Sequence, residues 1–421
     1  MKTNPNRRTF IRNIAAVTAF PLAVPAFAAV AKPDVAPLPD TPLKDEAFWE
    51  MVKAQFAVPD DHLMMNAANL CPSPYFIHQK VNDLNEQLSK DVSFHFRSRF
   101  TESRKTAIQH LARLINADTE EVGITRNTSE SNGMIISGLD LKAGDEVVVW
   151  DQNHPSNGVL WEQQAKRKGF LVKKVKVPAN PSSASELTLA FEKAIGPKTK
   201  VLAFSHISNT SGIALDAAAI CRMARSRNVL TLVDGAQSLG AIQIDVKQLQ
   251  CDFYSASTHK WLMGPMENGV LFIRRELLGQ VAPSIAGGGW REGGHTVDEK
   301  LCVLGQRNDP STAVLADCVA FHQKIGVAEV EKRVKELSAY LKRQLQDRVP
   351  GLTFVTPLPP ELSAGVVIFN VEGKDPGVIY NTLYEKHRIA SAPSGGVRLS
   401  PHIYNTKRDI DTVVDAVRGM A

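Results

Sequence analysis

The chain has 421 residues, 43% of them hydrophobic and 22% charged, a composition that predicts a globular protein with one large and one smaller domain and excludes a largely disordered chain. Its 49 Lys and Arg residues exceed its 44 Asp and Glu residues, but four of the bases, Lys2, Arg7, Arg8 and Arg12, lie at the N-terminus, and 49 less these four leaves 45 against 44. This near-neutral balance, with no second basic cluster, argues against a nucleic-acid partner.

The N-terminal segment resembles a twin-arginine export signal. Paired arginines precede an uncharged run over 13–31 that ends in small residues, and two prolines interrupt its apolar part. These features favour a cleaved signal over a membrane span. We therefore expect a signal peptide over 1–31, cleaved after Ala28 or Ala31, export by the twin-arginine translocase to the periplasm, and no stable membrane anchor. A proline-rich N-terminal arm is expected to follow over 32–62.

Beyond the arm, short β-branched segments alternate with longer amphipathic ones. Strand followed by helix, repeated with strands that are apolar on both faces, predicts an α/β fold with a mainly parallel sheet covered by helices. Ligands bind such sheets at the carboxyl ends of the strands. We assign this large domain to 63–300. Strands are expected at 144–150, 169–177, 200–208, 229–236, 251–258 and 268–275, and helices at 157–168, 185–195 and 217–226.

The last part of the chain has a different pattern, with long helical segments and a few short strands. It predicts a smaller α+β C-terminal domain over 301–421. Helices are expected at 310–324, 327–349, 376–386 and 406–420, and strands at 352–357, 365–373 and 396–400.

Polar side chains follow four predicted strands of the large domain. They are His154, Asn209, Asp234 with Gln237 three positions later, and Lys260. Each of them alone is more often a helix cap, a turn former or a solvated charge. Because parallel strands end at the same edge of a sheet, the four strand ends together predict one shared site.

A fifth polar segment enters a predicted helix through Thr128 and Ser129, in "ITRNTSESNG". A helix N-terminus with free N–H groups and two hydroxyls is suited to binding a phosphate, although an ordinary helix cap has the same appearance. The chain has neither GxGxxG nor GxxxxGK[ST], so a nicotinamide-dependent Rossmann enzyme and an ATP site are disfavoured.

An amine, a carboxylate and a phosphate site at one sheet edge match the needs of pyridoxal 5′-phosphate (PLP). This cofactor requires a lysine for its Schiff base, an acidic partner for its ring nitrogen and an anion cradle. A carboxylate beside the ring nitrogen favours the protonated ring, which withdraws electrons more strongly. Lys260 and Asp234 are the candidates for these two roles.

The segment "DGAQSLGAIQIDVKQLQCDFYSASTHKWLMGP" resembles the active-site segment of the class V aminotransferase family of fold type I PLP-dependent enzymes. The DGAQ motif, the SxHK motif and the 26-residue spacing from Asp234 to Lys260 occur together. The similarity extends over most of the chain after about residue 66. That family contains isopenicillin N epimerase-like proteins, cysteine desulfurases and related lyases.

The resemblance implies a role for each matching residue. Lys260 forms the internal aldimine, Asp234 pairs with the ring nitrogen and His154 stacks on the ring, so these three are the predicted catalytic residues. Arg398, in "GVRLSPHIYNT", matches the arginine that binds a substrate carboxylate; without the YNT motif a surface ion pair would be the better interpretation. The remaining cofactor contacts are implied for Thr128, Ser129, Asn209, Gln237, Ser257 and His259.

The sequence departs from the family pattern at two places. Cysteine desulfurases carry a nucleophilic cysteine shortly before the arginine motif, whereas "HRIASAPSGGVRLS" has none, so persulfide chemistry of that kind is not expected. The five cysteines form no CxxC pair, so neither a metal site nor a disulfide framework is predicted, and we expect small buried side chains. Gln306 stands where many relatives have a threonine that reaches the partner subunit's phosphate.

We therefore predict a homodimeric, exported PLP enzyme that acts at the amine-bearing carbon of an amino acid or of an amine-containing metabolite. Epimerisation, transamination and elimination, including C–S lysis, all remain open. In its family and its export signal, the chain also resembles a periplasmic enzyme that tailors the side chain of the siderophore pyoverdine. The alternative to an enzyme is a binding protein that has the PLP fold without the chemistry. Such a protein would have no need of the Lys260 amine.

Overall fold

The structure, a computed structural model, describes residues 37–39 and 44–421. The predicted export signal over 1–31 and part of the predicted arm lie outside the described residues. Residues 38–421 cluster into one compact unit that contains two main sheets.

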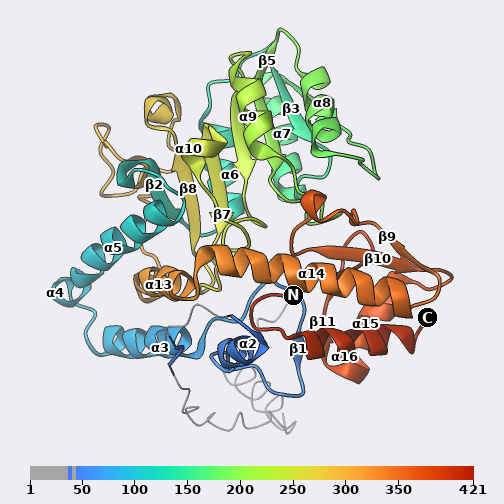
Figure 1. The fold of residues 1–421 in the computed structure, drawn as a ribbon. Coiled ribbons are helices and arrows are strands. Elements are labelled where there is room, and N and C mark those ends of the chain that lie inside the picture. Colours follow the sequence, from blue (N-terminus) through green and yellow to red (C-terminus); the bar gives the residue numbers. More distant parts are fainter. Residues whose placement is uncertain (1–36, 40–43) are drawn as a thin grey trace, which may run out of the picture. The chain divides into compact units, whose positions relative to one another are not determined.

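The larger sheet has seven strands in the order β2-β8-β7-β6-β5-β3-β4 (Figure 1). All neighbouring pairs are parallel except those that β8 makes with β7 and β2. The mainly parallel sheet predicted from the sequence is thus confirmed. Its strands are β2 (Val122–Thr125), β3 (Glu146–Trp150), β4 (Leu171–Val175), β5 (Thr199–Ser205), β6 (Leu230–Asp234), β7 (Phe253–Ser257) and β8 (Gly269–Ile273).

The central strands of this sheet are buried on both faces. In β3, Val148 and Trp150 join one hydrophobic cluster, while Val147 and Val149 join another on the opposite face. This alternation follows from the two-residue period of a strand, and it explains why the strands are continuously apolar.

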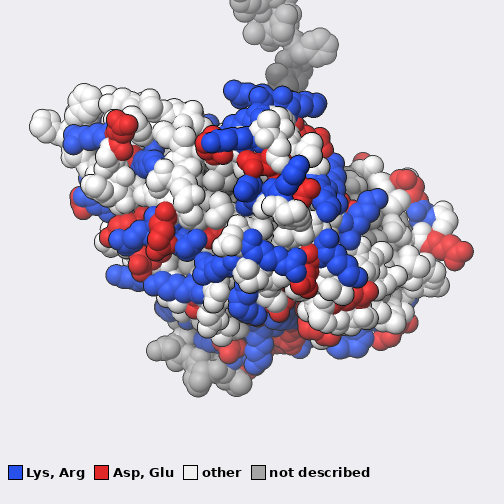
Figure 2. Space-filling view, turned by 90° about the horizontal axis from the view of Figure 1, so that it is seen from above, with Lys and Arg blue, Asp and Glu red and all other residues white. Residues whose placement is uncertain are grey.

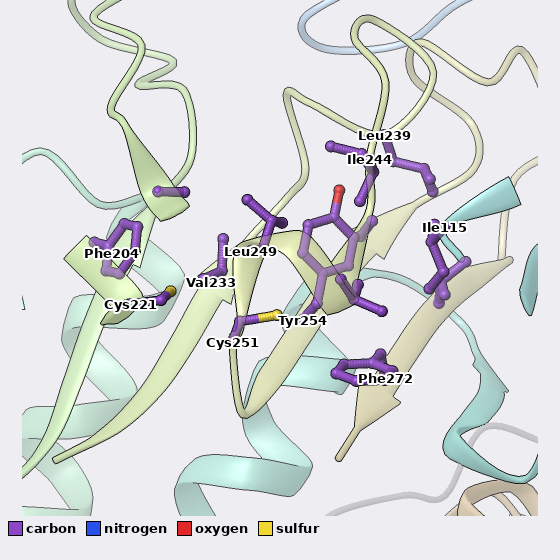
Figure 3. Close-up of a cluster of buried hydrophobic side chains, with 14 of the residues drawn as sticks. Ile115, Phe204, Cys221, Val233, Leu239, Ile244, Leu249, Cys251, Tyr254 and Phe272 are labelled. Atoms are coloured by element: carbon purple, nitrogen blue, oxygen red, sulfur yellow. The ribbon is translucent and has the colours of Figure 1, made fainter. Parts of the chain in front are cut away.

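Figure 3 shows part of the first cluster, with Cys221 and Cys251 packed among apolar side chains. All five cysteines are free and buried, as the sequence predicted. Tyr254, in the same cluster, lies against the chain directly after Asp234: a Cβ on Gly235 would come within 2.1 Å of its ring. Glycine is therefore required at this position for the close approach of β6 and β7.

Helices cover both faces of the sheet, as expected. The predicted helices at 157–168, 185–195 and 217–226 are α7, α8 and α9, each displaced by at most two residues at its start. The helices up to residue 249 are α2 (Glu46–Lys53), α3 (Tyr75–Lys90), α4 (Phe94–Arg97), α5 (Arg99–Leu114), α6 (Thr128–Gly138), α7 (Pro155–Lys168), α8 (Ala184–Ala194), α9 (Ala217–Arg225) and α10 (Val246–Leu249).

The smaller sheet is antiparallel, in the order β12-β13-β10-β9, and packs against long C-terminal helices (Figure 1). Its strands are β9 (Leu352–Phe354), β10 (Val367–Val371), β12 (Ala392–Pro393) and β13 (Val397–Leu399). The helices of this part are α11 (Val297–Leu301), α12 (Asp309–Ala313), α13 (Leu315–Ile325), α14 (Val327–Arg348), α15 (Pro376–His387) and α16 (Lys407–Arg418).

The single helix predicted at 310–324 is wrong, because α12 and α13 are separate. Val314 lies between the two helices with φ of −91° and ψ of 0°, and it is fully buried in a cluster with Ile77 and Phe100. Packing of this β-branched side chain between α3 and α5 accompanies the break, which periodicity alone does not reveal.

The described part of the arm lies against the C-terminal region. In α2, Glu46 accepts two hydrogen bonds from the buried guanidinium of Arg333, and Lys53 forms an ion pair with Asp409 at 2.7 Å. The short strand β1 (Leu63–Met64) pairs with β11 (Ile389–Ala390). Segments far apart in the sequence are thereby joined below the larger sheet.

On the face shown in Figure 2, basic and acidic side chains are interspersed. Charged side chains of the described residues also form ion pairs, for example Arg227 with Glu192 and Lys174 with Glu162. Among the residues that the structure describes, every helix is too short or too polar to cross a bilayer.

Candidate active site

Lys260 lies in the turn that connects β7 to β8, directly after the carboxyl end of β7. Backbone hydrogen bonds close this turn, from Met263 N to Lys260 O and from Gly264 N to Thr258 O, both at 2.8 Å. Met263 is buried with φ of +56°, a left-handed conformation that costs a non-glycine residue energy and marks a tightly constrained loop.

The Lys260 amine is a base tuned by its surroundings. Burial lowers its pKa from 10.5 to about 8, the negative charge of Asp234 opposes that change, and the positive charge of Arg398 adds to it. Asp234, Arg398 and Lys260 therefore lie within electrostatic reach of one another, although they are far apart in sequence. Near neutral pH such an amine exchanges protons readily.

Asp234 closes β6 and is held on both sides of its carboxylate. Its Oδ1 accepts a hydrogen bond from the backbone N–H of Ala236 at 3.0 Å, and its Oδ2 accepts one from the Asn132 amide at 2.9 Å. Asp234 is 3% exposed, so these donors replace water. Asn132 was not predicted from the sequence, since nothing in its local pattern distinguishes it from an ordinary helix-interior asparagine.

Gln237 is buried, and two groups determine the orientation of its amide. Its Oε1 accepts from Trp261 Nε1 and its Nε2 donates to the Ala68 carbonyl, each at 2.8 Å. Because Trp261 Nε1 can only donate, the amide is oriented with its NH₂ group toward Ala68, and one N–H is left for another acceptor. Trp261, directly after the lysine, is a second residue that the sequence analysis missed.

His154 precedes α7, and its ring makes a hydrogen bond to Ser156. The backbone N–H of Ser156 donates to His154 Nδ1 at 3.3 Å, so Nδ1 is the acceptor and the neutral ring carries its proton on Nε2. Ring burial lowers the pKa of His154, Lys260 and Arg398 lower it further, and Asp234 opposes them. His154 therefore belongs to the same electrostatic cluster.

Two residues of the predicted anion cradle, Thr128 and Ser257, meet where α6 approaches the end of β7. Ser257 Oγ accepts from the Thr128 N–H at 2.9 Å and lies 2.6 Å from the Thr128 hydroxyl, so that this pair keeps one hydroxyl hydrogen for a further acceptor. The helix is capped by Asn127, whose Oδ1 accepts from Glu130 N, rather than by a threonine or serine. Ser129, exposed in the first turn, lies 3.1 Å from Ser156 Oγ.

Arg398 is buried in β13 and points its guanidinium at two segments. It donates to the backbone carbonyl of Asn209 at 3.2 Å and to Asn66 Oδ1 at 3.1 Å. Burial lowers its pKa to about 10, so it remains a cation at neutral pH. The structure thus joins Asn209 to the site through its backbone, and it adds Asn66, which the sequence analysis missed.

These residues fit PLP. Two buried nitrogens without a hydrogen-bond partner within residues 37–39 and 44–421 belong to predicted binding residues, Nδ1 of His259 and Nε of Arg398. Burial lowers the pKa of His259 to about 4, so its neutral ring can donate to a phosphate at neutral pH. Amine, carboxylate, hydroxyl cradle and arginine are the donor set that the cofactor and an amino-acid carboxylate require.

The thiols are poorly suited to nucleophilic chemistry. Cys71 lies 3.4 Å from the Tyr404 hydroxyl, and burial raises its pKa to about 12. Burial also raises the pKa of Cys302 well above its ordinary value.

Gln306 accepts a hydrogen bond from Arg97 of the same chain.

Comparison with known proteins identifies one family. The model of the family "Aminotransferase class-V" matches residues 77–413. The isopenicillin N epimerase of Streptomyces clavuligerus is 29% identical over 390 residues, which cover 88% of this chain and 98% of that protein. A probable cysteine desulfurase of Pyrococcus abyssi is 30% identical over 363 residues, 80% of this chain and 84% of that protein. The solved cysteine desulfurase CsdA of Escherichia coli superposes with a TM-score of 0.78 at 25% identity, covering 89% of this chain and 98% of the other.

Proposed function

Since the chain belongs to the class V aminotransferase family and is a PLP-dependent enzyme of the fold type I class, we propose that it acts at the amine-bearing carbon of an amino acid or of a larger metabolite with a free amine. The observation that supports this most is the amine of Lys260, whose pKa is lowered to about 8 and which is coupled to Asp234 and Arg398. PLP, when bound, supplies an electron sink for the bond broken at that carbon.

In this proposal Lys260 holds the cofactor and moves the proton. A pKa of about 8 leaves a useful neutral fraction at neutral pH, so the amine can accept a proton from the substrate carbon and return it. Asp234 stabilises the protonated ring nitrogen by its negative charge. His154, with its proton on Nε2, covers the cofactor ring.

Arg398 binds the substrate carboxylate. Its Nε has no protein partner in the described structure, while Asn66 and the Asn209 carbonyl fix the plane of the guanidinium. A guanidinium held in this way offers parallel N–H donors to a carboxylate, which orients the amine-bearing carbon toward Lys260.

Among the reactions of its relatives, we favour epimerase-like chemistry over persulfide chemistry. Segment 387–400 has no cysteine, and all five thiols are buried. Racemisation, transamination and elimination, including C–S lysis, need only the amine, the carboxylate and the arginine. A larger amine-containing metabolite, as in tailoring of a pyoverdine-type siderophore, is the alternative substrate, supported by the resemblance of 1–31 to an export signal.

We further propose that the enzyme is exported through the twin-arginine pathway and works as a homodimer in the periplasm. The pattern of the N-terminal sequence supports export. Fractionation of cells that produce the full chain tests localisation: the mature protein is expected with the periplasmic fraction, and uncleaved protein in the cytoplasm alone would contradict it.

The decisive experiment is a visible spectrum of the purified protein, followed by borohydride reduction and mass mapping. We expect an absorption band that reduction removes, with a phosphopyridoxyl adduct on Lys260. Lys260→Ala is expected to abolish turnover, with Lys300→Ala as a control for loss of a lysine elsewhere. Normal turnover by Lys260→Ala would refute the assignment. Screening amines by product chirality, keto-acid release and sulfide release then separates the three reaction types.

A further inference from the structure

Asn132 connects two buried polar groups on neighbouring strands, Asp234 at the carboxyl end of β6 and Ser255 in the middle of β7. It lies in α6, is 2% exposed, and donates through Nδ2 to Asp234 Oδ2 at 2.9 Å. On its other side, Asn132 Oδ1 accepts from the hydroxyl of Ser255 at 2.5 Å. A buried amide with both ends engaged is fixed in place.

The direction of this chain of hydrogen bonds follows from the chemistry of the three groups. A carboxylate can only accept, so the NH₂ end of Asn132 faces Asp234. The Asn132 oxygen then needs a donor, and Ser255 provides it. Asp234 therefore determines which way round the Asn132 amide stands, the Ser255 hydroxyl holds the oxygen end of that amide, and the amide in turn fixes where Asp234 Oδ2 lies.

The strands add a second constraint on the same carboxylate. Asp234 and Ser255 are register partners in the parallel pair β6 and β7, so their separation is set by the sheet. Asp234 Oδ1 accepts from Ala236 N at 3.0 Å. With one donor on each oxygen, from opposite sides, the side chain is held in one rotamer before any ligand contacts it.

We infer that Asn132 and Ser255 are positioning residues of the proposed PLP site, which hold Asp234 against the ring nitrogen of the cofactor. The inference rests on the proposed function, in which Asp234 pairs with that nitrogen. Neither residue touches the cofactor in this scheme, so their effect passes through the Asp234 carboxylate alone. Their loss should change the electronic properties of the cofactor more than the binding of substrate.

The test uses the holoenzyme with the variants Asn132→Leu and Ser255→Ala. Leucine has the branched shape of asparagine but no donor, and Ser255→Ala removes the donor that holds the oxygen end of Asn132. For Asn132→Leu we expect about tenfold weaker PLP retention and about tenfold lower kcat, with an altered pH titration of the visible band and KM within about twofold. Ser255→Ala should move the same quantities in the same direction by less.

Thr231→Val is the matched control. Thr231 Oγ1 donates to the buried carboxylate of Asp252 at 3.1 Å, at the opposite ends of the same two strands. Thr231→Val removes a comparable buried hydrogen bond between two residues that are 21 apart in sequence. Thr231 lies near the start of β6, whereas Asp234 ends that strand. It should lower stability without altering the spectrum, the PLP affinity or kcat.

The outcomes separate the inference from the proposed function. If wild-type protein carries no adduct on Lys260, both are overturned. If wild-type protein carries the adduct but Asn132→Leu and Ser255→Ala titrate like wild type and retain PLP equally, only the positioning role is overturned. Should Asn132→Leu fail to fold, Ser255→Ala decides alone, and a spectrum that changes equally in Thr231→Val also counts against the inference.

Discussion

The lowered pKa of Lys260 predicts that this residue destabilises the protein once PLP has been removed. Lys260→Met is the test, since methionine has a similar length and no charge. In the folded protein the amine titrates near 8, whereas in the unfolded chain it titrates near 10.5. Below pH 8 both forms are protonated, so the cost of burying the cation is fully present. Between the two values the unfolded chain binds more protons, so stability rises with pH, and above about pH 10.5 the cost has gone.

The shift from 10.5 to about 8 corresponds to a cost of about 3 kcal/mol at pH 7, at about 1.4 kcal/mol for each pKa unit. Because Lys260 is partly rather than fully buried, we expect about 1–3 kcal/mol after solvent screening. Cofactor-free Lys260→Met should therefore be more stable than cofactor-free wild type by this amount at pH 7. This difference in the free energy of unfolding should fall to about a quarter of its pH 7 value by pH 10.

The assay is urea unfolding of both proteins, stripped of PLP with hydroxylamine and followed by the fluorescence of the five tryptophans. Subtracting wild type from variant at each pH cancels the other titrating groups. Lys342 provides the contrast, since burial lowers its pKa to about 8 as well, but its Nζ donates to Pro357 O, Leu358 O and Ser363 Oγ. Lys342→Met should therefore destabilise, by about 2 kcal/mol. A Lys260→Met gap that stays constant with pH, or a variant less stable than wild type at pH 7, would refute the reasoning.

Three further predictions concern the site. Trp261→Phe removes the donor that orients Gln237; we expect about a fivefold loss of kcat and a shifted visible band, whereas an unchanged band would show that the amide needs no such support. Arg398→Lys loses the planar pair of donors, so KM for a carboxylate-bearing substrate should rise about a hundredfold while the PLP spectrum stays the same; equal KM values would remove Arg398 from substrate binding. Cys71→Ala should keep turnover within about twofold of wild type, because the pKa of this thiol is raised to about 12, and a large loss of sulfide release would point to persulfide chemistry after all.

The sequence predicts the groups that follow strands better than the groups that support them. Lys260 and Asp234 belong to a contiguous segment whose alternation of strands and turns is local, and the structure places both at the carboxyl ends of neighbouring strands. The sheet, its parallel order and most helices follow from the same local patterns. The separate helices α12 and α13 were missed because the break at Val314 depends on packing against α3 and α5.

The supporting residues were missed because their roles depend on distant contacts. Asn132 meets Asp234 across 102 residues of sequence, and Asn66 meets Arg398 across 332. An asparagine in a helix or after a short strand has no local pattern that reveals such a partner. Likewise Arg398 binds the carbonyl of Asn209, and a backbone group carries no sequence signal.

Helix α6 carries residues that lie at both ends of the proposed cofactor site. Its first turn carries Thr128 and Ser129 of the predicted anion cradle, and its second turn carries Asn132, which donates a hydrogen bond to the Asp234 carboxylate. One rigid helix therefore sets the distance between the phosphate end and the nitrogen end of the proposed cofactor site. Because Thr128 is bonded to Ser257 and Asn132 to Ser255, both on β7, the strand fixes the rotation of the helix as well. A change that rotates α6 should thus weaken phosphate binding and the hold on Asp234 together, whereas a change in either contact alone should affect one end of the cofactor.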